Sequence, residues 1–421
     1  MMGKPKIRFK GYNEDWEQRK LGEVLVSLQN NTLSRADLSN ETGIAKNVHY
    51  GDVLIKFGEV LDVSEEKLPM ISDKSVLTKY KASFLQNGDV IVADTAEDST
   101  VGKCSEIAGL NDEVVLSGLH TIPYRPIEKF ASGYLGYYLN SSAYHKQLIP
   151  LMQGIKVTSI SKSAMQNTEI VYPKSVEEQG KIGNYFQSLD HLITLHQHKC
   201  DEMKKMKKCM LQKMFPQNGK KVPEIRFEGF TNDWEQRKLN EIADRVSEKN
   251  KNNEFSEPFT NSAEQGIISQ RDYFDREIVN NENLNGYYIV RNDDFIYNPR
   301  ISVTAPVGPI NRNRLGRNGV MSPLYTVFRT HDINNLYLEF YFKTTKWHRF
   351  MKLNGDSGAR FDRFTISSTQ FMEMPIPYPM LDEQIKIGEY FDTLDHLITL
   401  HQHKCDELQN LKKYMLQNMF V

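Results

Sequence analysis

One stretch of fourteen residues, LDHLITLHQHKCDE, occurs twice in the chain, at residues 189–202 and again at residues 394–407. These copies lie within a longer repeat, residues 177–215 and 382–420, in which 28 of 39 positions are identical. A second repeat precedes each copy, residues 5–24 and 223–242, with 13 of 20 positions identical. The 421-residue chain is therefore a duplicated frame, made of these four segments, around two inserts that differ from each other, residues 22–172 and 240–379.

The longer repeat predicts two long helices. Seam residues recur in alternating steps of four and three, which is the spacing of a coiled coil. The residues expected to pair the helices are Ile182, Phe186, Leu189 and Ile193 in the first copy and Ile387, Phe391, Leu394 and Ile398 in the second. Each helix would be about 58 Å long at 1.5 Å per residue. The sequence SVEE at residues 175–178 is a capping box that would start the first helix.

The inserts have the pattern of mixed α/β domains. Strand-like runs in the first insert occupy residues 89–93, 122–124 and 168–171, with a helix-like stretch at residues 131–139. The second insert has residues 287–290, 294–297, 325–328 and 335–343 in a comparable order. The predicted fold is α+β, with two mixed α/β domains separated by two long helices that form an antiparallel coiled coil with an internal pseudo-two-fold repeat.

The repeat boundaries predict four segments. They are a first domain at residues 1–172, a central long helix and linker at 173–222, a second domain at 223–379, and a C-terminal long helix at 380–421. No apolar run approaches the roughly 18 residues of a membrane span, and four cysteines are too few for a disulfide framework. The composition therefore predicts a cytoplasmic protein with no membrane partner.

Motifs of catalysis are missing from the sequence. There is no phosphate-binding GxxxxGK[ST] loop, no GxSxG elbow and no HExxH pair. The nearest match to the motif of amino-methyltransferases, Asn298-Pro299-Arg300, lacks the second proline and the aromatic residue. The sequence predicts a protein that is not an enzyme and that itself binds no cofactor.

The HQHKC segments offer one alternative, a zinc site. His196 and Cys200 lie one helical turn apart, as do His401 and Cys405, and antiparallel pairing would gather two histidines and two cysteines. Seam packing accounts for the same spacing. The prediction is therefore no bound metal, with a zinc protein centred on these segments as an alternative.

The DWEQRKL element before each insert and the EQxKIGxYFxxLD start of each long helix resemble the specificity subunit of type I restriction–modification systems. The resemblance covers nearly the whole chain. It implies a non-catalytic DNA-binding subunit with two target-recognition domains, each of which reads one half of a bipartite target in double-stranded DNA.

The resemblance also implies partner subunits. The helices would dock two modification subunits, which are adenine methyltransferases that use S-adenosylmethionine. Two restriction subunits, which combine endonuclease and translocase, would complete an assembly that uses Mg and ATP. A different class of function stays open, a coiled-coil adaptor whose two lobes bind protein or glycan and never touch DNA.

Loops with cationic and hydrogen-bonding side chains are the candidates for contact with DNA. A net charge of −1 offers no global attraction, so such contact would depend on local clusters. Residues 298–319 carry four arginines and no acidic residue, and two more arginines lie in or after a GDSGA turn. The predicted DNA-binding residues are Arg300, Arg312, Arg314, Arg317, Arg360 and Arg363 in the second insert, and Lys103, Lys156, Thr158 and Lys162 in the first.

These loops also have a structural interpretation. Residues 298–319 would equally suit a solvated hairpin closed by Asn318-Gly319, and any single candidate would suit an ordinary surface loop. Trp16 and Trp234 are predicted to anchor the frame to the domain cores. The lysine-rich run at residues 204–208 would either contact phosphates or form the solvated face of the helix.

Overall fold

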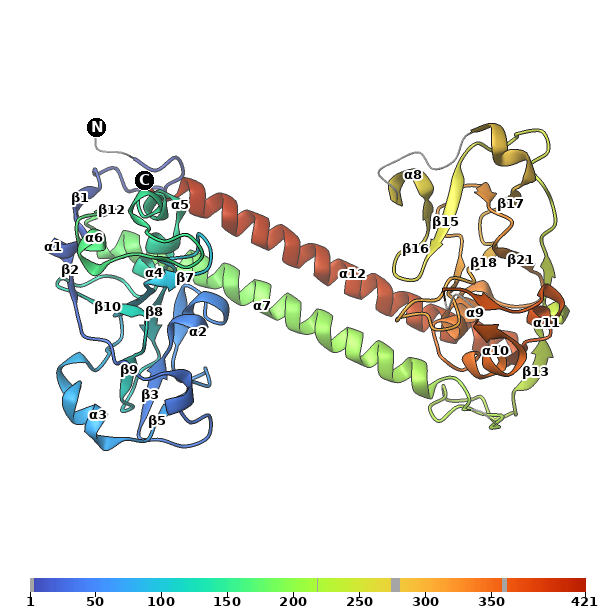
Figure 1. The fold of residues 1–421 in the computed structure, drawn as a ribbon, viewed down its shortest axis with the longest axis horizontal. Helices are drawn as coiled ribbons and strands as arrows, with labels where there is room; N and C mark the ends of the chain where they lie inside the picture. The colour runs from blue at the N-terminus through green and yellow to red at the C-terminus, as the bar shows by residue number, and fades with distance from the viewer. Residues whose placement is uncertain (1–3, 218, 274–280, 358–361) are drawn as a thin grey trace. The chain divides into compact units, whose positions relative to one another are not determined.

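A computed structural model describes residues 4–217, 219–273, 281–357 and 362–421, and the chain divides into two compact units. Unit 1 comprises Met1–Gln197 and Gln402–Val421, and unit 2 comprises His198–His401. Each unit holds one mixed α/β domain and part of each long helix, α7 (Val176–Lys213) and α12 (Leu381–Asn418) (Figure 1). The predicted fold, two mixed α/β domains and two long helices packed together, is confirmed. The four-segment division stays a prediction, because the two units share the long helices.

The domain of unit 1 is built on a five-stranded sheet in the order β2-β10-β6-β8-β4. Its strands are β2 (Leu25–Ser27), β10 (Thr121–Pro126), β6 (Val90–Ala93), β8 (Cys104–Ala108) and β4 (Val60–Asp62). All four residues of β6, VIVA, are buried, as an apolar run in a central strand should be. A three-stranded sheet, β5-β3-β9, joins Met70–Ile71, Ala45–Val48 and Val115–Ser117. The domain helix α4 (Tyr134–Asn140) contacts β8.

The domain of unit 2 contains two four-stranded sheets. The first has the order β14-β21-β18-β19, formed by Ala243–Arg245, Thr326–Thr330, Phe295–Tyr297 and Ile310–Arg312. The second has the order β16-β15-β20-β17, formed by Gly266–Ser269, Pro258–Ser262, Gly319–Met321 and Tyr288–Val290. The domain helix α9 (Asn335–Phe342) contacts β19. The predicted strands of both inserts are confirmed, with bounds that shift by one or two residues.

The frame forms a matching strand pair in each unit. β1 (Glu17–Lys20) pairs antiparallel with β12 (Glu169–Tyr172), and β13 (Glu235–Lys238) pairs with β24 (Pro375–Tyr378) in the same register. The tryptophan that precedes each pair is buried, Trp16 at 1% exposure and Trp234 at 3%. The prediction that these tryptophans anchor the frame to the core is confirmed.

The EQ dipeptide near the start of each long helix attaches the helix to its unit. Glu178 of α7 forms an ion pair with Arg8, and Glu383 of α12 forms one with Arg226, each with an N–O distance of 2.6 Å. The backbone N–H of Glu178 also donates to Ser175 Oγ at 3.3 Å, which is the serine half of the predicted capping box.

The glutamine of each EQ dipeptide bonds backbone groups of the domain. Gln179 Oε1 accepts the N–H of Ala131 at 3.0 Å, and the Gln179 amide donates to a proline carbonyl at 2.8 Å. Gln384 Oε1 accepts the N–H of Asn334 at 2.9 Å, and its amide also donates to a proline carbonyl at 2.8 Å. The identical letters of the frame thus make identical contacts in the two units.

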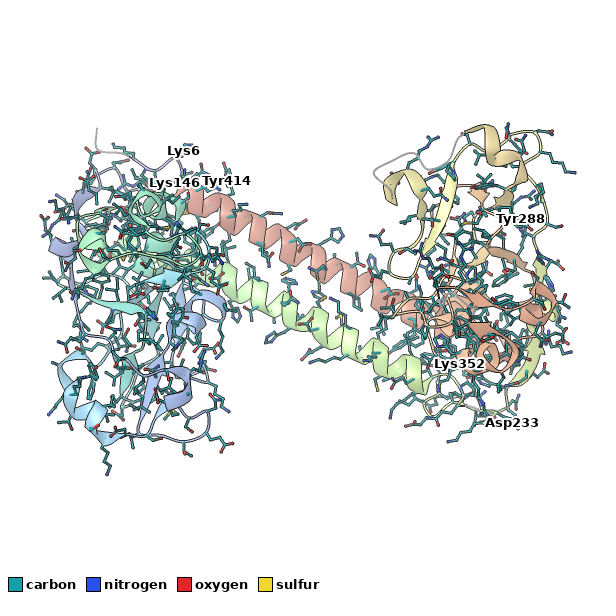
Figure 2. All side chains as sticks on the ribbon, viewed as in Figure 1. Lys6, Lys146, Asp233, Tyr288, Lys352 and Tyr414 are labelled. Carbon is teal, nitrogen blue, oxygen red and sulfur yellow. The ribbon has the colours of Figure 1, made fainter. Side chains whose placement is uncertain are left out.

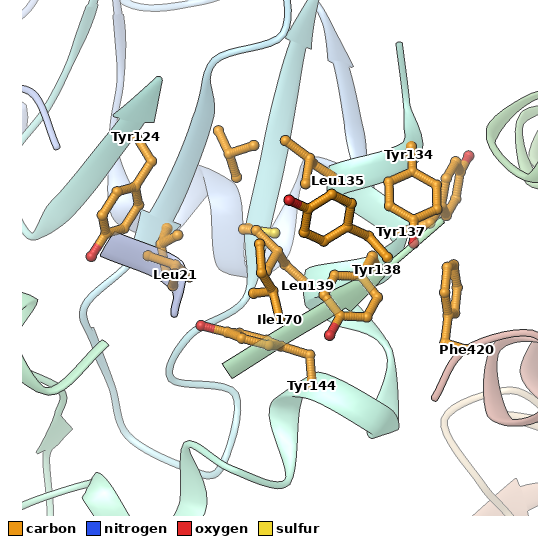
Figure 3. Packing of buried hydrophobic residues seen from close by; sticks show 14 of the residues in the cluster. Leu21, Tyr124, Tyr134, Leu135, Tyr137, Tyr138, Leu139, Tyr144, Ile170 and Phe420 are labelled. Carbon is orange, nitrogen blue, oxygen red and sulfur yellow. The ribbon is translucent and has the colours of Figure 1, made fainter. Parts of the chain in front are cut away.

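Within each unit, the start of one long helix packs beside the end of the other. In unit 1, Phe186 stacks on Phe420, which follows α12, with ring centroids 5.7 Å apart. Figure 3 shows Phe420 beside the tyrosines of α4, and Tyr137 of that helix lies 5.1 Å from Phe186. In unit 2, Phe391 stacks on Phe215 at 6.1 Å.

Six of the eight predicted seam residues are at most 5% exposed: Ile182, Phe186, Leu189, Ile387, Phe391 and Leu394. The other two, Ile193 and Ile398, are partly buried. Several of the six also belong to the domain cores, because α4 and α9 pack on the same face of the long helices. The seam spacing did not indicate this second partner.

Candidate nucleic-acid interface

In unit 2 the structure brings together two loops that are distant in sequence. The loop after β18 pairs with the segment before α11 (Ser368–Met372), since the N–H of Ile301 donates to the Asp362 carbonyl at 2.9 Å. The pairing includes an antiparallel bridge between Arg300 and Arg363. Arg300 and Arg363 are both exposed, so two of the predicted DNA-binding arginines lie on adjacent backbones. Arg360 lies outside the described residues.

In unit 1 the corresponding loops meet in the same way. β7 (Thr95–Ala96), which follows β6, pairs with β11 (Thr158–Ser159). The hydroxyl of Thr158 donates to the carbonyls of Ala96 and Asp98, at 3.2 and 3.1 Å. Lys156 lies just before β11 and Lys162 begins α6 (Lys162–Gln166), and both lysines are exposed. Each domain thus presents one composite surface of two paired loops.

A polar cavity of about 490 Å³ lies beside Arg300 in unit 2. Its lining comes from β15 and the turn after it, the loop after β18 and the residue before β21, and comprises Thr260, Asn261, Ser262, Ala263, Glu264, Asn298, Arg300, Ile301, Ser302, Thr304, Pro309 and Tyr325. Hydroxyl, amide, guanidinium and carboxylate groups line it together, and these are the groups that read base edges. We call it the unit 2 groove.

Unit 1 has a counterpart, a cavity of about 420 Å³ that we call the unit 1 groove. It is lined by Leu28, Gln29, Asn30, Lys79, Tyr80, Asp94, Thr121, Ile122, Pro123, Ile160, Ser161 and Lys162. Asp94 directly follows β6, as Asn298 directly follows β18, so the two grooves lie at the same end of equivalent strands. The sequence does not indicate Glu264, Tyr325 and Asp94 as site residues, because they join the candidate loops only in the folded domain.

Three of the predicted DNA-binding arginines are held in ion pairs. Arg312, 11% exposed at its side chain, binds Asp293 at 2.9 Å and Glu339 at 2.8 Å. Arg314 binds the same Glu339 and also Asp392 of α12, each at 2.8 Å. These carboxylates come from outside residues 298–319, so the acid-free sequence gave no sign of them. Arg312 and Arg314 therefore link β19 to α9 and α12.

Arg317 is paired in the same manner. Its guanidinium binds both oxygens of Glu257, at 2.7 and 2.8 Å, and this bonding lowers the pKa of the Glu257 carboxyl. The alternative of a hairpin closed by Asn318-Gly319 is wrong, because β19 and β20 on either side join different sheets.

Lys103, the last predicted residue, points inward. Its ammonium donates to the carbonyl of Leu54 at 2.8 Å, and burial lowers its pKa. Arg300, Arg363, Lys156 and Lys162 are exposed and lie on or beside the paired loops, whereas Arg314 and Arg317 are also exposed but bind carboxylates of unit 2.

The two HQHKC segments lie within the long helices, one in α7 and one in α12. Cys200 and Cys405 are 1% and 2% exposed, and the Cys200 thiol lies 3.9 Å from the carbonyl oxygen of Ile398. In the part of the chain that the structure describes, no three His, Cys, Asp or Glu side chains are grouped so as to hold a metal ion. Nor does any described helix have the length and apolar character needed to cross a membrane.

Comparison with known proteins agrees with the fold. The family model of the type I restriction modification DNA specificity domain matches residues 13–205 and 231–410. A putative type I restriction enzyme MjaX specificity subunit of Methanocaldococcus jannaschii is 24% identical over 428 residues, covering 96% of this chain and 92% of that protein. The MjaVIII specificity subunit of the same organism is 23% identical over 279 residues, 63% of this chain and 64% of that protein.

A solved structure has the same fold. The type I restriction–modification S subunit from M. genitalium is 14% identical, with a TM-score of 0.59, over 100% of this chain and 99% of that chain. The family match covers most of the chain and includes both copies of the frame. The chain therefore belongs to the type I restriction–modification DNA specificity family, as its sequence predicted, and is a non-catalytic specificity subunit.

Proposed function

We propose that each domain reads one half of a bipartite target in double-stranded DNA. The observation that carries this proposal is the recurrence of one arrangement in two dissimilar inserts, paired loops with exposed cations beside a polar groove. Cations suit phosphates, and the amide, hydroxyl and carboxylate groups of the grooves suit base edges. Because the grooves differ in nearly every lining residue, the two half-targets should differ.

The contacts in this proposal are the members of the predicted set that lie on or beside the paired loops. Arg300 and Arg363, with Arg360 from the sequence, serve the second domain, and Lys156, Thr158 and Lys162 serve the first. Arg312, Arg314, Arg317 and Lys103 were predicted for the same role, and their bonds within the domain support a positioning role instead. An arginine that already binds a carboxylate of its own unit is less available to a phosphate.

We further propose that the long helices dock two modification subunits, one on each copy of the frame. Equivalent positions expose apolar side chains, Leu195 at 39% and Leu400 at 54%, then Met206 at 40% and Leu411 at 41%. Tyr414 adds a further exposed ring on α12 (Figure 2). These modification subunits would use S-adenosylmethionine, two restriction subunits would use Mg and ATP, and the assembly would work in the cytoplasm.

Methylation mapping tests the proposal. The chain would be produced with an adenine methyltransferase subunit of this system type, and methylated adenines would be located across the host genome. We expect one motif of two short elements separated by an unread spacer. If no methyltransferase copurifies and no motif appears, the adaptor alternative replaces this proposal.

The contact residues need a separate experiment on the assembled methyltransferase. Arg300→Ala and Arg363→Ala should each weaken binding of the specific duplex by about 1–3 kcal/mol where a base contact is lost. Arg291→Ala is the matched control, since Arg291 is exposed and pairs with Glu248 at 3.2 Å outside the groove lining. Unchanged affinity in both groove variants would remove these arginines from the interface.

A further inference from the structure

A second cavity in unit 2, of about 760 Å³, lies between the C-terminal half of α7 and the segment that follows α9. It is lined by Lys204, Lys207, Lys208, Leu211, Gln212, Gln217, Lys343, Thr344, Thr345, Lys346, Asp395 and Ile398. Five of these residues are lysines. Of the described residues that line it, Asp395 alone is acidic, and Lys207 already forms an ion pair with this carboxylate.

The equivalent place in unit 1 has a different charge. Lys412 is the counterpart of Lys207, and each lysine ammonium lies over an aromatic ring, Tyr137 at 5.4 Å and Phe340 at 5.3 Å. Lys412 is bound by two carboxylates, Asp190 at 2.7 Å and Glu59 at 2.8 Å. The frame thus supplies equivalent ion pairs in the two units, Lys207–Asp395 and Lys412–Asp190. The surplus, the four further lysines of the cavity, is particular to unit 2.

The surplus comes from both walls of the cavity. Lys204 is replaced by Gln409 at the matching position of the second frame copy, so the α7 wall differs even within the repeat. The opposite wall adds Lys343 and Lys346, which belong to the second insert. Charges of one sign that converge on one cavity repel each other unless an anion is bound there.

Buried amides link the lysine cavity to the unit 2 groove. The ammonium of Lys343 donates to Asn311 Oδ1 at 2.9 Å, and the Asn311 amide donates to Asn261 Oδ1 at 2.7 Å. Asn261 lines the groove and is 2% exposed. One buried side chain, that of Asn311, therefore separates the lining of the cavity from the lining of the groove.

We propose that the lysine cavity binds the phosphodiester backbone of the DNA whose bases the unit 2 groove reads. This inference rests on the proposed function and adds a contact site to it. Lysines act as point charges without the fixed fork of arginine, which suits phosphates that must be held but not identified. The lining contains no aromatic residue on which a free nucleotide could stack its base.

The salt dependence of binding measures this contact. The assembled methyltransferase would carry Lys204→Gln, Lys208→Gln and Lys346→Gln together, and its affinity for the specific duplex would be measured between 50 and 200 mM salt. Glutamine removes the charge but keeps a long side chain and helix propensity. Each lost phosphate contact reduces the magnitude of the slope of log affinity against log salt by about 0.9. The slope of the triple variant should therefore be smaller in magnitude by about two to three. The methylated motif should not change.

The chain supplies its own matched control. Lys413 is the frame counterpart of Lys208, is exposed, and does not line this cavity, so Lys413→Gln should leave the slope unchanged. A wild-type slope in the triple variant would overturn the inference. Loss of the methyltransferase subunit from the variant at an unchanged slope would instead assign the cavity to a protein partner.

A small anion is the remaining occupant to test. Inorganic pyrophosphate that binds the wild-type chain but not the triple variant, at an unchanged DNA slope, would also overturn the inference. Failure of the proposed function would be distinguished from either result, because the wild-type complex would then show no methylated motif at all.

Discussion

Unit 1 and unit 2 attach the domain helix to the sheet by different chemistry. In unit 1, Glu106 of β8 accepts the N–H groups of Gly133 at 2.6 Å and Gly136 at 3.0 Å, at the start of α4. In unit 2, Arg312 of β19 instead forms an ion pair with Glu339 of α9. A buried carboxyl on the strand in one domain thus corresponds to a cation on the strand in the other.

The frame shows the opposite behaviour. The pairs Arg8–Glu178 and Arg226–Glu383 have the same distance and nearly the same burial in the two units. This comparison shows which contacts are the same in both units and which are not. Contacts that join a domain to the long helices are the same in both units, whereas contacts inside a domain need only solve the same packing problem, which leaves the groove residues free to differ.

The largest effect should come from breaking a frame ion pair. Arg226→Ala leaves Glu383, whose side chain is 0% exposed, without its partner, and Arg8→Ala does the same to Glu178 at 2%. Removing one member of a buried pair costs about 3–5 kcal/mol. Chemical unfolding of the two variants should give losses of similar size, because the two copies of the frame make the same contact.

Lys221→Ala is the control for this pair of variants. Lys221 and Asp233 form an exposed ion pair, with side chains 74% and 65% exposed, on the surface of unit 2 (Figure 2). Its removal should cost less than about 1 kcal/mol. A large loss in one frame variant and a small loss in the other would contradict the equivalence of the two units.

The next effect concerns pH and should separate the two domains. Burial raises the pKa of Glu106 to about 7, although the backbone N–H groups of Gly136 and Gly133 oppose the shift. A carboxyl whose pKa is raised on folding binds its proton more tightly in the folded state. Its contribution to stability is therefore complete below about pH 4.5 and is lost as the pH rises through 7, a change of about 3 kcal/mol.

Glu106→Gln removes the titrating group and should abolish this part of the pH dependence. Unfolding free energies would be measured at pH 5 and pH 8 for the wild type and the variant, and the variant should gain relative stability at pH 8. Glu373→Gln is a control near the surface, since Glu373 is half-buried and pairs with Lys238. If wild type and Glu106→Gln differ in unfolding free energy by the same amount at pH 5 and at pH 8, this carboxyl does not titrate between those pH values.

A smaller effect should come from the glycines at which the long helices meet their domains. A Cβ on Gly388 would lie 2.7 Å from Leu336 Cβ, and one on Gly183 would lie 2.9 Å from the carbonyl of Ser132. Alanine at either position should cost about 1–2 kcal/mol in thermal or chemical unfolding, because the clash outweighs the gain in helix propensity.

Gly180→Ala tests the same helix without the clash. The added Cβ would meet Ala131 Cβ at 3.7 Å, an ordinary contact. This variant should be stabilised by about 0.5–1 kcal/mol. If Gly183→Ala were stabilised as well, the close approach of α7 to α4 would be in error.

The repeated frame explains how much the sequence could predict. Seam spacing and duplication led to the two long helices, and the alternation of apolar runs led to the strands, because each of these signals is local. The partner of a seam residue is not local. Phe186 packs on Tyr137 of the domain as well as on Phe420, and a period of 3.6 indicates a face without indicating what covers it.

The candidate site shows the same limit. The arginine-rich stretch was predicted as a cluster, but Glu339 and Glu257, which bind its members, come from other parts of the chain. The bridge between Arg300 and Arg363 likewise depends on tertiary pairing. Composition finds a cation, and only the fold decides whether that cation is already paired.

The central claim is that the frame is common and the inserts read DNA independently, and an insert exchange tests it most directly. Residues 22–168 would be replaced by the matching insert of another member of the family, which leaves the β1–β12 strand pair in place. The methylated motif would then be mapped with the same methyltransferase subunit. We expect one half of the motif to change and the other half to stay as it was. A change in both halves, or in neither, would contradict the account.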